Sequence, residues 1–127
     1  MIPTVVWVAI GGAIGSAARY GVNVWSFKLL GNEFPWHTLI VNLLGSFVMG
    51  ALTELMALKL DVSLETRAFL TTGILGGFTT FSAFSLDFAL MMERKAFLAA
   101  GSYALASVLL SFVAIFSGFH LMRALLQ

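Results

Sequence analysis

Residues 71–85, TTGILGGFTTFSAFS, decide the fold of this chain. The fifteen residues include three glycines, six threonines or serines and three phenylalanines, and none of them is charged. Such a segment forms a weak helix, and in hydrocarbon an unpaired backbone group costs roughly 4–8 kcal/mol. Irregular backbone at membrane depth persists only where protein buries it or where it lines a polar path. The stretch therefore predicts a helix that is broken in mid-membrane at a functional site.

The rest of the chain has the composition of an integral membrane protein. It has 127 residues, a mean hydropathy of +0.98 and only 10% charged residues. Uncharged stretches cover residues 1–18, 34–53, 68–86 and 96–122. A helix needs about 20 residues to cross about 30 Å of hydrocarbon. The sequence predicts an all-α integral membrane protein, a single domain over residues 1–127 with four transmembrane helices, the third broken.

Residues for enzymatic chemistry are scarce. There is no cysteine, and the net charge of +1 argues against a nucleic-acid partner. His37 and His120 lie at the ends of spans without a carboxylate at motif spacing, so placement at the membrane interface is their expected role. Glu54 and Asp87 are expected near span ends, in reach of water. The sequence thus predicts a protein that is not an enzyme.

The positive charges hardly favour either orientation in the membrane. Loops on the N-terminal side of the bundle carry Lys59, Arg67 and Arg123. Those on the opposite side carry Arg19, Lys28, Arg94 and Lys95. Because topology follows the imbalance of Lys and Arg between short loops, the chain can insert both ways and pair as a dual-topology antiparallel homodimer. The alternative is that the charges of one loop dominate and insertion is unique.

Two spans carry stripes of uncharged polar residues. Thr38, Asn42 and Ser46 recur every four residues in the second span, and Tyr103, Ser107 and Ser111 do so in the fourth. Their O–H and N–H groups can replace part of the hydration of a small anion and still release it, as conduction requires. For a single hydroxyl, the alternative is a hydrogen bond to a carbonyl one turn back. In the first span, Gly11/Gly15 and Gly12/Ser16 predict close helix packing.

The third span adds phenylalanines and glycines to this pattern. Phe78, Phe81, Phe84 and Phe88 are spaced by three, three and four residues. Packing against lipid or core is the usual role of such a row, but these rings alternate with hydroxyls beside Gly76-Gly77. The electropositive edge of an aromatic ring can form a weak anion site. Carbonyls freed by a broken helix could hold a small cation such as Na⁺.

These elements together resemble the Fluc (CrcB-type) fluoride channels over essentially the whole chain. They are GGAIGSAARY at residues 11–20, HTLIVNLLGSFVMG at 37–50, GILGGFTTFSAF at 73–84, and the stripe of Tyr103, Ser107 and Ser111. The second and third elements, in this order in a four-span chain of this length, are highly specific. One departure is visible, because Ala83 stands where the family has threonine.

The resemblance implies passive, fluoride-selective conduction that lowers cytoplasmic fluoride, by an antiparallel homodimer in the bacterial inner membrane. Its partners would be fluoride, a second copy of the chain and the lipid bilayer. The residues that would line the pores are Phe81, Phe84, Asn42, Thr38, Tyr103, Ser107 and Ser111. Arg19 would lie in a vestibule, although snorkelling to the headgroups is equally open for it. Backbone carbonyls of Gly76 and Thr79 from both subunits would hold a structural Na⁺ at the dimer centre.

Two other functions fit a short four-span chain. A small multidrug-type proton-coupled exporter would need a carboxylate deep in the first span, which is uncharged over residues 1–18. A non-transporting assembly or anchoring subunit would leave the polar stripes and the broken third span without a role.

Overall fold

The computed structural model describes residues 2–127 and contains only helices and short connections over that range. The helices are α1 (Thr4–Leu30), α2 (Trp36–Leu58), α3 (Leu64–Ala68), the π-helix η1 (Phe69–Leu75), α4 (Gly76–Phe78), α5 (Ser82–Glu93) and α6 (Phe97–Leu126). Four helical units, namely α1, α2, the run Leu64–Glu93 and α6, are long and apolar enough to cross a membrane. The predicted all-α membrane fold with four spans is confirmed.

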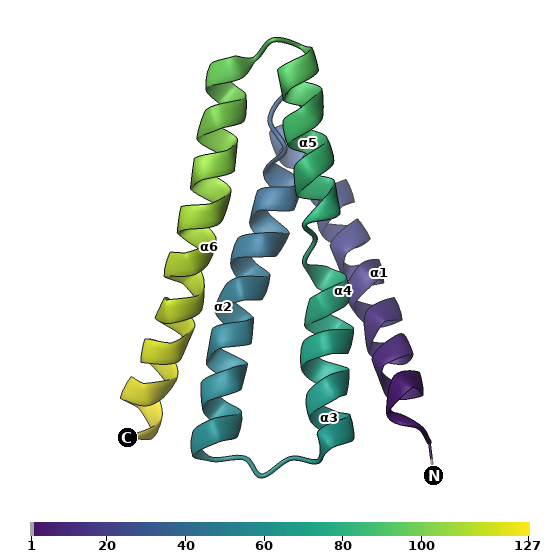
Figure 1. Ribbon diagram of the computed structural model, residues 1–127, viewed down its shortest axis with the longest axis vertical. Coiled ribbons are helices and arrows are strands. Elements are labelled where there is room, and N and C mark those ends of the chain that lie inside the picture. Colours follow the sequence, from purple (N-terminus) through teal and green to yellow (C-terminus); the bar gives the residue numbers. More distant parts are fainter. Residues whose placement is uncertain (1) are drawn as a thin grey trace.

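The four spans run up and down, so that both termini and the α2–α3 connection lie at one end (Figure 1). The α1–α2 and α5–α6 connections lie at the other end, called here the loop end. Local sequence places these boundaries: α1 ends at Leu30, directly before Gly31, whose φ of 76° suits glycine, and α2 starts directly after Pro35. At the start of α3, the Ser63 hydroxyl accepts a hydrogen bond from the Thr66 amide at 3.1 Å.

The spans pack as two pairs that spread apart toward the end that carries the termini (Figure 1). One pair is α2 with α6, and the other is α1 with η1 and α4. A small core at the loop end joins α2, α5 and α6 through Leu39, Met91, Ala100 and Tyr103. Most large apolar side chains elsewhere are exposed, including Leu109 and Phe116 on α6, as expected for a surface that faces lipid.

Glycines allow the helices within each pair to pack closely against one another. A methyl group on Gly11 would lie 2.6 Å from the Phe69 carbonyl oxygen, and one on Gly15 would collide with the Ile74 carbonyl. In the other pair, Gly50 of α2 leaves no room for a side chain against the Ile115 carbonyl of α6. The close packing predicted for Gly11 and Gly15 is therefore confirmed, and its partner is the first half of the third span.

The third span is interrupted as the sequence predicts. After α4, Thr79 adopts an extended conformation (φ −89°, ψ 161°), and the helix resumes only at Ser82. The sequence did not predict the π-helix that precedes the break, where the turn widens over Phe69–Leu75. Two departures from α-helical geometry thus lie within one span, both in the stretch with the most glycine and threonine.

Candidate functional site

A cavity of about 410 Å³ lies between α2, the break in the third span and α6. It brings together five of the seven predicted pore residues, namely Asn42, Phe81, Phe84, Ser107 and Ser111. Ser46 and Thr80 add further hydroxyls to its wall. A separate cavity of about 450 Å³, where α1 and α3 begin, is lined by none of the predicted residues. The polar stripes of α2 and α6 therefore converge on the helix break.

Asn42 binds the backbone of the break. Its amide nitrogen donates to the Thr80 carbonyl at 3.0 Å, and its Oδ1 accepts from the Thr80 amide at 2.8 Å. In a continuous helix the Thr80 amide would instead donate to the carbonyl of Gly76. The Ala83 amide is similarly diverted and donates to the Thr80 hydroxyl at 3.1 Å, rather than to the carbonyl of Thr79. Both predicted cation ligands thus lack the amide that a helix would give them.

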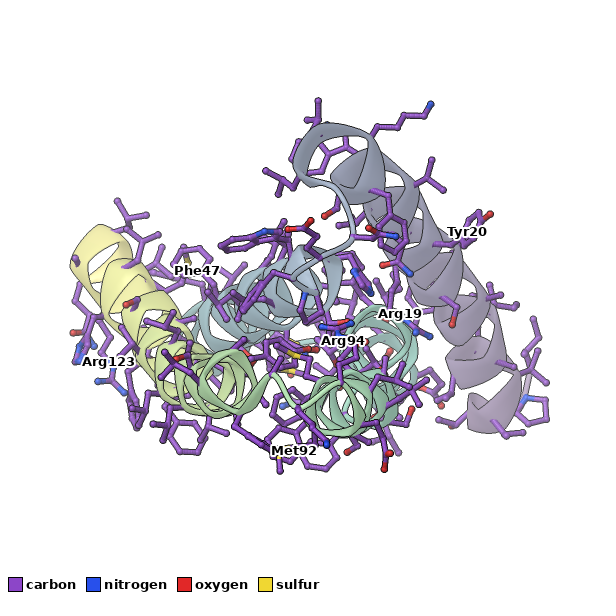
Figure 2. All side chains as sticks on the ribbon, turned by 90° about the horizontal axis from the view of Figure 1, so that it is seen from above. Arg19, Tyr20, Phe47, Met92, Arg94 and Arg123 are labelled. Atoms are coloured by element: carbon purple, nitrogen blue, oxygen red, sulfur yellow. The ribbon has the colours of Figure 1, made fainter. Side chains whose placement is uncertain are left out.

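Arg19 reaches another carbonyl of the same break. Its Nε donates to the Gly77 carbonyl oxygen at 3.0 Å, across the contact between α1 and α4. Figure 2 shows the side chain extending from α1 toward the third span. This placement disfavours the snorkelling alternative, because the guanidinium is partly buried and directed at the bundle. Its remaining N–H groups keep a positive charge beside the interrupted backbone.

Phe81 and Phe84 meet edge to face at the cavity. Their ring centroids are 5.5 Å apart with an interplanar angle of 62°. Phe84 also lies 5.2 Å from the ring of Tyr103. Phe81 is 75% exposed on the isolated chain, although it sits at the break of a transmembrane span. The pair can therefore present ring edges to the cavity, and one ring has little cover from its own chain.

Thr38 and Tyr103 lie outside the cavity, on its loop-end side. The Thr38 hydroxyl donates to Asp87 Oδ2 at 2.6 Å, and the Tyr103 hydroxyl donates to the same oxygen at 2.9 Å. Asp87, expected near a span end in reach of water, lies within α5 (Ser82–Glu93) and is half-buried. Its side chain lies between α2 and α6 and holds two of the hydroxyls predicted for the pore. A charged acceptor makes both hydrogen bonds strong ones.

The remaining polar groups differ in their partners. Ser107 is only 5% exposed, and its hydroxyl has no hydrogen-bond partner among residues 2–127. Ser111 lies one turn further along α6 on the same cavity wall. Glu54, at the far end of the α2 stripe, forms an ion pair with Arg123 at 3.0 Å. A free buried hydroxyl in the cavity wall is a donor available to a bound anion.

Sequence reasoning missed the roles of Asp87 and Thr80 in this site. Thr38 and Asp87 are 49 residues apart in sequence, and Asn42 and Thr80 are 38 apart. Nothing local links these pairs. The only available signal for Asp87 was its register, because it follows Phe84 by three residues and shares a face with it.

Comparison with known proteins places the chain among close relatives. The family model described as "CrcB-like protein, Camphor Resistance (CrcB)" matches residues 6–119. A "Fluoride-specific ion channel FluC" from Agrobacterium fabrum is 55% identical over 93% of this chain and 94% of the relative. The protein of the same name from Rhizobium johnstonii is also 55% identical over the same shares. A third, from Chelativorans sp., is 52% identical over 94% of this chain and 95% of the relative.

Proposed function

The chain belongs to the CrcB-like family, and from that premise we propose that it is a passive, fluoride-selective channel of the bacterial cell membrane. It would let fluoride leave the cell down its gradient and so lower the cytoplasmic level. The observation that carries this proposal is the cavity at the helix break, where uncharged donors and two phenylalanine edges converge. A channel of this kind converts no substrate, so the proposal includes no enzymatic reaction.

The chemistry of the cavity suits a small, strongly hydrated anion. The hydroxyls of Ser107 and Ser111 can replace waters of hydration without the deep trap that a fixed positive charge would create. The edges of Phe81 and Phe84 offer a further weak site. Several weak sites in a row allow an ion to enter and to leave, which conduction requires. Arg19, beside the break, would raise the local concentration of anions.

An antiparallel dual-topology homodimer is the assembly that we propose. Phe81, 75% exposed on the isolated chain, would be covered by a second copy. The cavity that it lines is open on the same side of the chain, so the site is incomplete in one copy. The small difference in positive charge between the two ends supports insertion in both orientations.

A structural Na⁺ at the dimer centre is the remaining part of the proposal. The carbonyls of Gly76 and Thr79 fit this ion, because the amides of Thr80 and Ala83 donate to side chains instead. Gly76 is exposed, which would let its carbonyl meet that of a second copy. Carbonyl oxygens of interrupted helices are suitable ligands for a hard monovalent cation. When bound, the ion would be coordinated by these carbonyl oxygens and would link the broken third spans of the two copies.

The two alternative functions have less support. A proton-coupled exporter needs a carboxylate in the first span, and α1 contains neither aspartate nor glutamate. An assembly subunit would have no use for a cavity with free donors. Fluoride efflux from liposomes that contain the purified protein tests all three. Release of fluoride but not chloride, without a proton gradient, is expected; no release, or release that needs a proton gradient, would reject the channel.

A further inference from the structure

A third cavity lies at the loop end and is smaller than the one at the helix break, which is called the large cavity below. Its volume is about 250 Å³, and Asp87 lies in its wall together with His37, Glu33, Asn32 and Arg94. A chain of contacts links the two cavities: Phe84 packs on Tyr103, and Tyr103 donates to Asp87. Phe84 lines the large cavity and Asp87 lines the loop-end cavity, so Tyr103 lies between the two.

His37 occupies a distinctive place in this wall. It is the second residue of α2 and precedes Thr38, which donates to Asp87. Its ring lies 4.7 Å from that of Phe27 on α1. The Nδ1 atom is buried and has no hydrogen-bond partner among residues 2–127. The imidazole thus has a free nitrogen that can take up a proton without breaking an existing hydrogen bond.

The charges around this histidine decide what a proton would do. The loop before α2 contributes Glu33, α5 contributes Asp87, and Arg94 follows directly after α5 and donates to the Glu33 backbone carbonyl at 3.4 Å. From α6, the Tyr103 hydroxyl is already donated to Asp87, and from α1 only the uncharged Phe27 lines the cavity. Two carboxylates and one guanidinium sum to −1 with a neutral imidazole and to zero with a protonated one. A cavity with a net negative charge repels an anion.

We propose that the loop-end cavity is a mouth of the anion path and that His37 is its proton-responsive residue. With a neutral imidazole, the net negative charge would hold fluoride away; with a protonated one, the mouth would be neutral. Imidazole is the side chain whose charge normally changes between about pH 5 and 8. Fluoride conduction would then rise as the solution is acidified. This proposal rests on the proposed channel function.

The test compares fluoride efflux from liposomes at about pH 6 and about pH 8, with the same pH on both sides. Protein-free liposomes give the leak of undissociated hydrogen fluoride at each pH, which is subtracted. The unsubstituted channel should conduct several-fold faster at the lower pH. H37Q should lose this dependence and conduct at the slower rate at both values. H120Q, which removes the chain's other histidine at an exposed position of α6, should retain it.

A second variant covers the case in which H37Q does not conduct. H37K carries a fixed positive charge and should conduct at about pH 8 as the unsubstituted channel does at about pH 6. Equal efflux by the unsubstituted channel at both values, or a dependence that persists in H37Q, would overturn the role of His37 and leave the channel function standing. Failure of both H37Q and H37K to conduct would also overturn the role of His37. No fluoride efflux by the unsubstituted chain at either pH would instead reject the channel function itself.

Discussion

Asn42 and Thr80 exchange two hydrogen bonds, one in each direction, at the point where the third span is broken. A side chain of α2 thereby takes the place of the missing helical turn and satisfies both backbone groups of Thr80. Unpaired, these two groups would each cost several kcal/mol at membrane depth, roughly 4–8 in a medium without hydrogen-bonding partners. The break is therefore stable only while α2 supplies an amide that both donates and accepts.

Asn42→Asp should abolish conduction. The substitution keeps the shape and the acceptor for the Thr80 amide, but it replaces the donor to the Thr80 carbonyl with a charged oxygen. Two unit charges 4 Å apart repel by about 4 kcal/mol near a protein surface, so fluoride flux should fall by at least roughly a hundredfold. Fluoride efflux from liposomes measures this. Unchanged efflux would remove Asn42 from the path and leave it a packing role alone.

Phe81→Ile and Phe84→Ile should each sharply reduce fluoride flux. Isoleucine retains apolar volume but has no electropositive ring edge. Phe81 in particular is mostly exposed, so its own chain loses little packing. Phe116→Ile is a matched control, because Phe116 and Phe119 form a similar edge-to-face pair at 5.8 Å on α6 outside the cavity lining. If all three variants conduct alike, the rings at the break are ordinary packing residues.

Tyr103→Phe should lower stability through Asp87. It preserves the stacking of the ring on Phe84 and removes one of two hydroxyls that the carboxylate accepts. Loss of a hydrogen bond to a charged group costs about 1.5–3 kcal/mol, which the midpoint of thermal unfolding in detergent would report. Tyr20→Phe serves as control, since Tyr20 points away from the bundle (Figure 2). A midpoint equal to that of this control would show that the hydrogen bond from Tyr103 to Asp87 does not stabilise the protein.

Much of this architecture could be predicted from local sequence. Four uncharged stretches define the spans, and the composition of residues 71–85 locates the break. Helical periodicity places Asn42 and Ser46 on one face of α2 and Ser107 and Ser111 on one face of α6, and all four line the cavity.

The partners of these residues could not be predicted, because they depend on which spans touch. Thr38 and Tyr103 look like free donors in sequence, yet both are bound to Asp87. Likewise, only the packing of α1 against the third span shows that Arg19 donates to the Gly77 carbonyl. The π-helix also escapes prediction, since threonine and glycine weaken a helix without specifying how it will deviate.

Gly15→Ala should separate the first and third spans. Its added methyl would meet the Ile74 carbonyl, a backbone group that cannot rotate away. Overpacking of this kind costs about 1–3 kcal/mol, and the displaced third span would also shift the break. Thermal unfolding and fluoride efflux should both decline. Gly21→Ala on the same helix has open space for the methyl and should resemble the parent in both measurements; equal behaviour of the two variants would refute close packing at Gly15.

The structure changes the count of positive charges at the two ends of the bundle, on which the proposed antiparallel dimer depends. Arg19 differs from the other positive residues, because its side chain is directed into the bundle and donates to the Gly77 carbonyl. Removing it from the chain's seven Lys and Arg residues leaves six. Lys59, Arg67 and Arg123 lie toward the end with the termini, and Lys28, Arg94 and Lys95 lie toward the loop end. Three against three is no imbalance at all, which is the condition for insertion in both orientations.

A few added charges should therefore fix the orientation and abolish function. Two extra lysines in the loop of residues 59–63 change the balance to five against three, and two beside Arg94-Lys95 change it to three against five. Each variant alone should insert one way, fail to build an antiparallel pair and leave cells sensitive to fluoride. Co-expression should restore fluoride resistance, since the two variants supply opposite orientations, whereas lysines that merely damage folding would damage it in either context. If each variant confers resistance alone, with its termini shown to lie on a single side of the membrane, the working unit is parallel or monomeric.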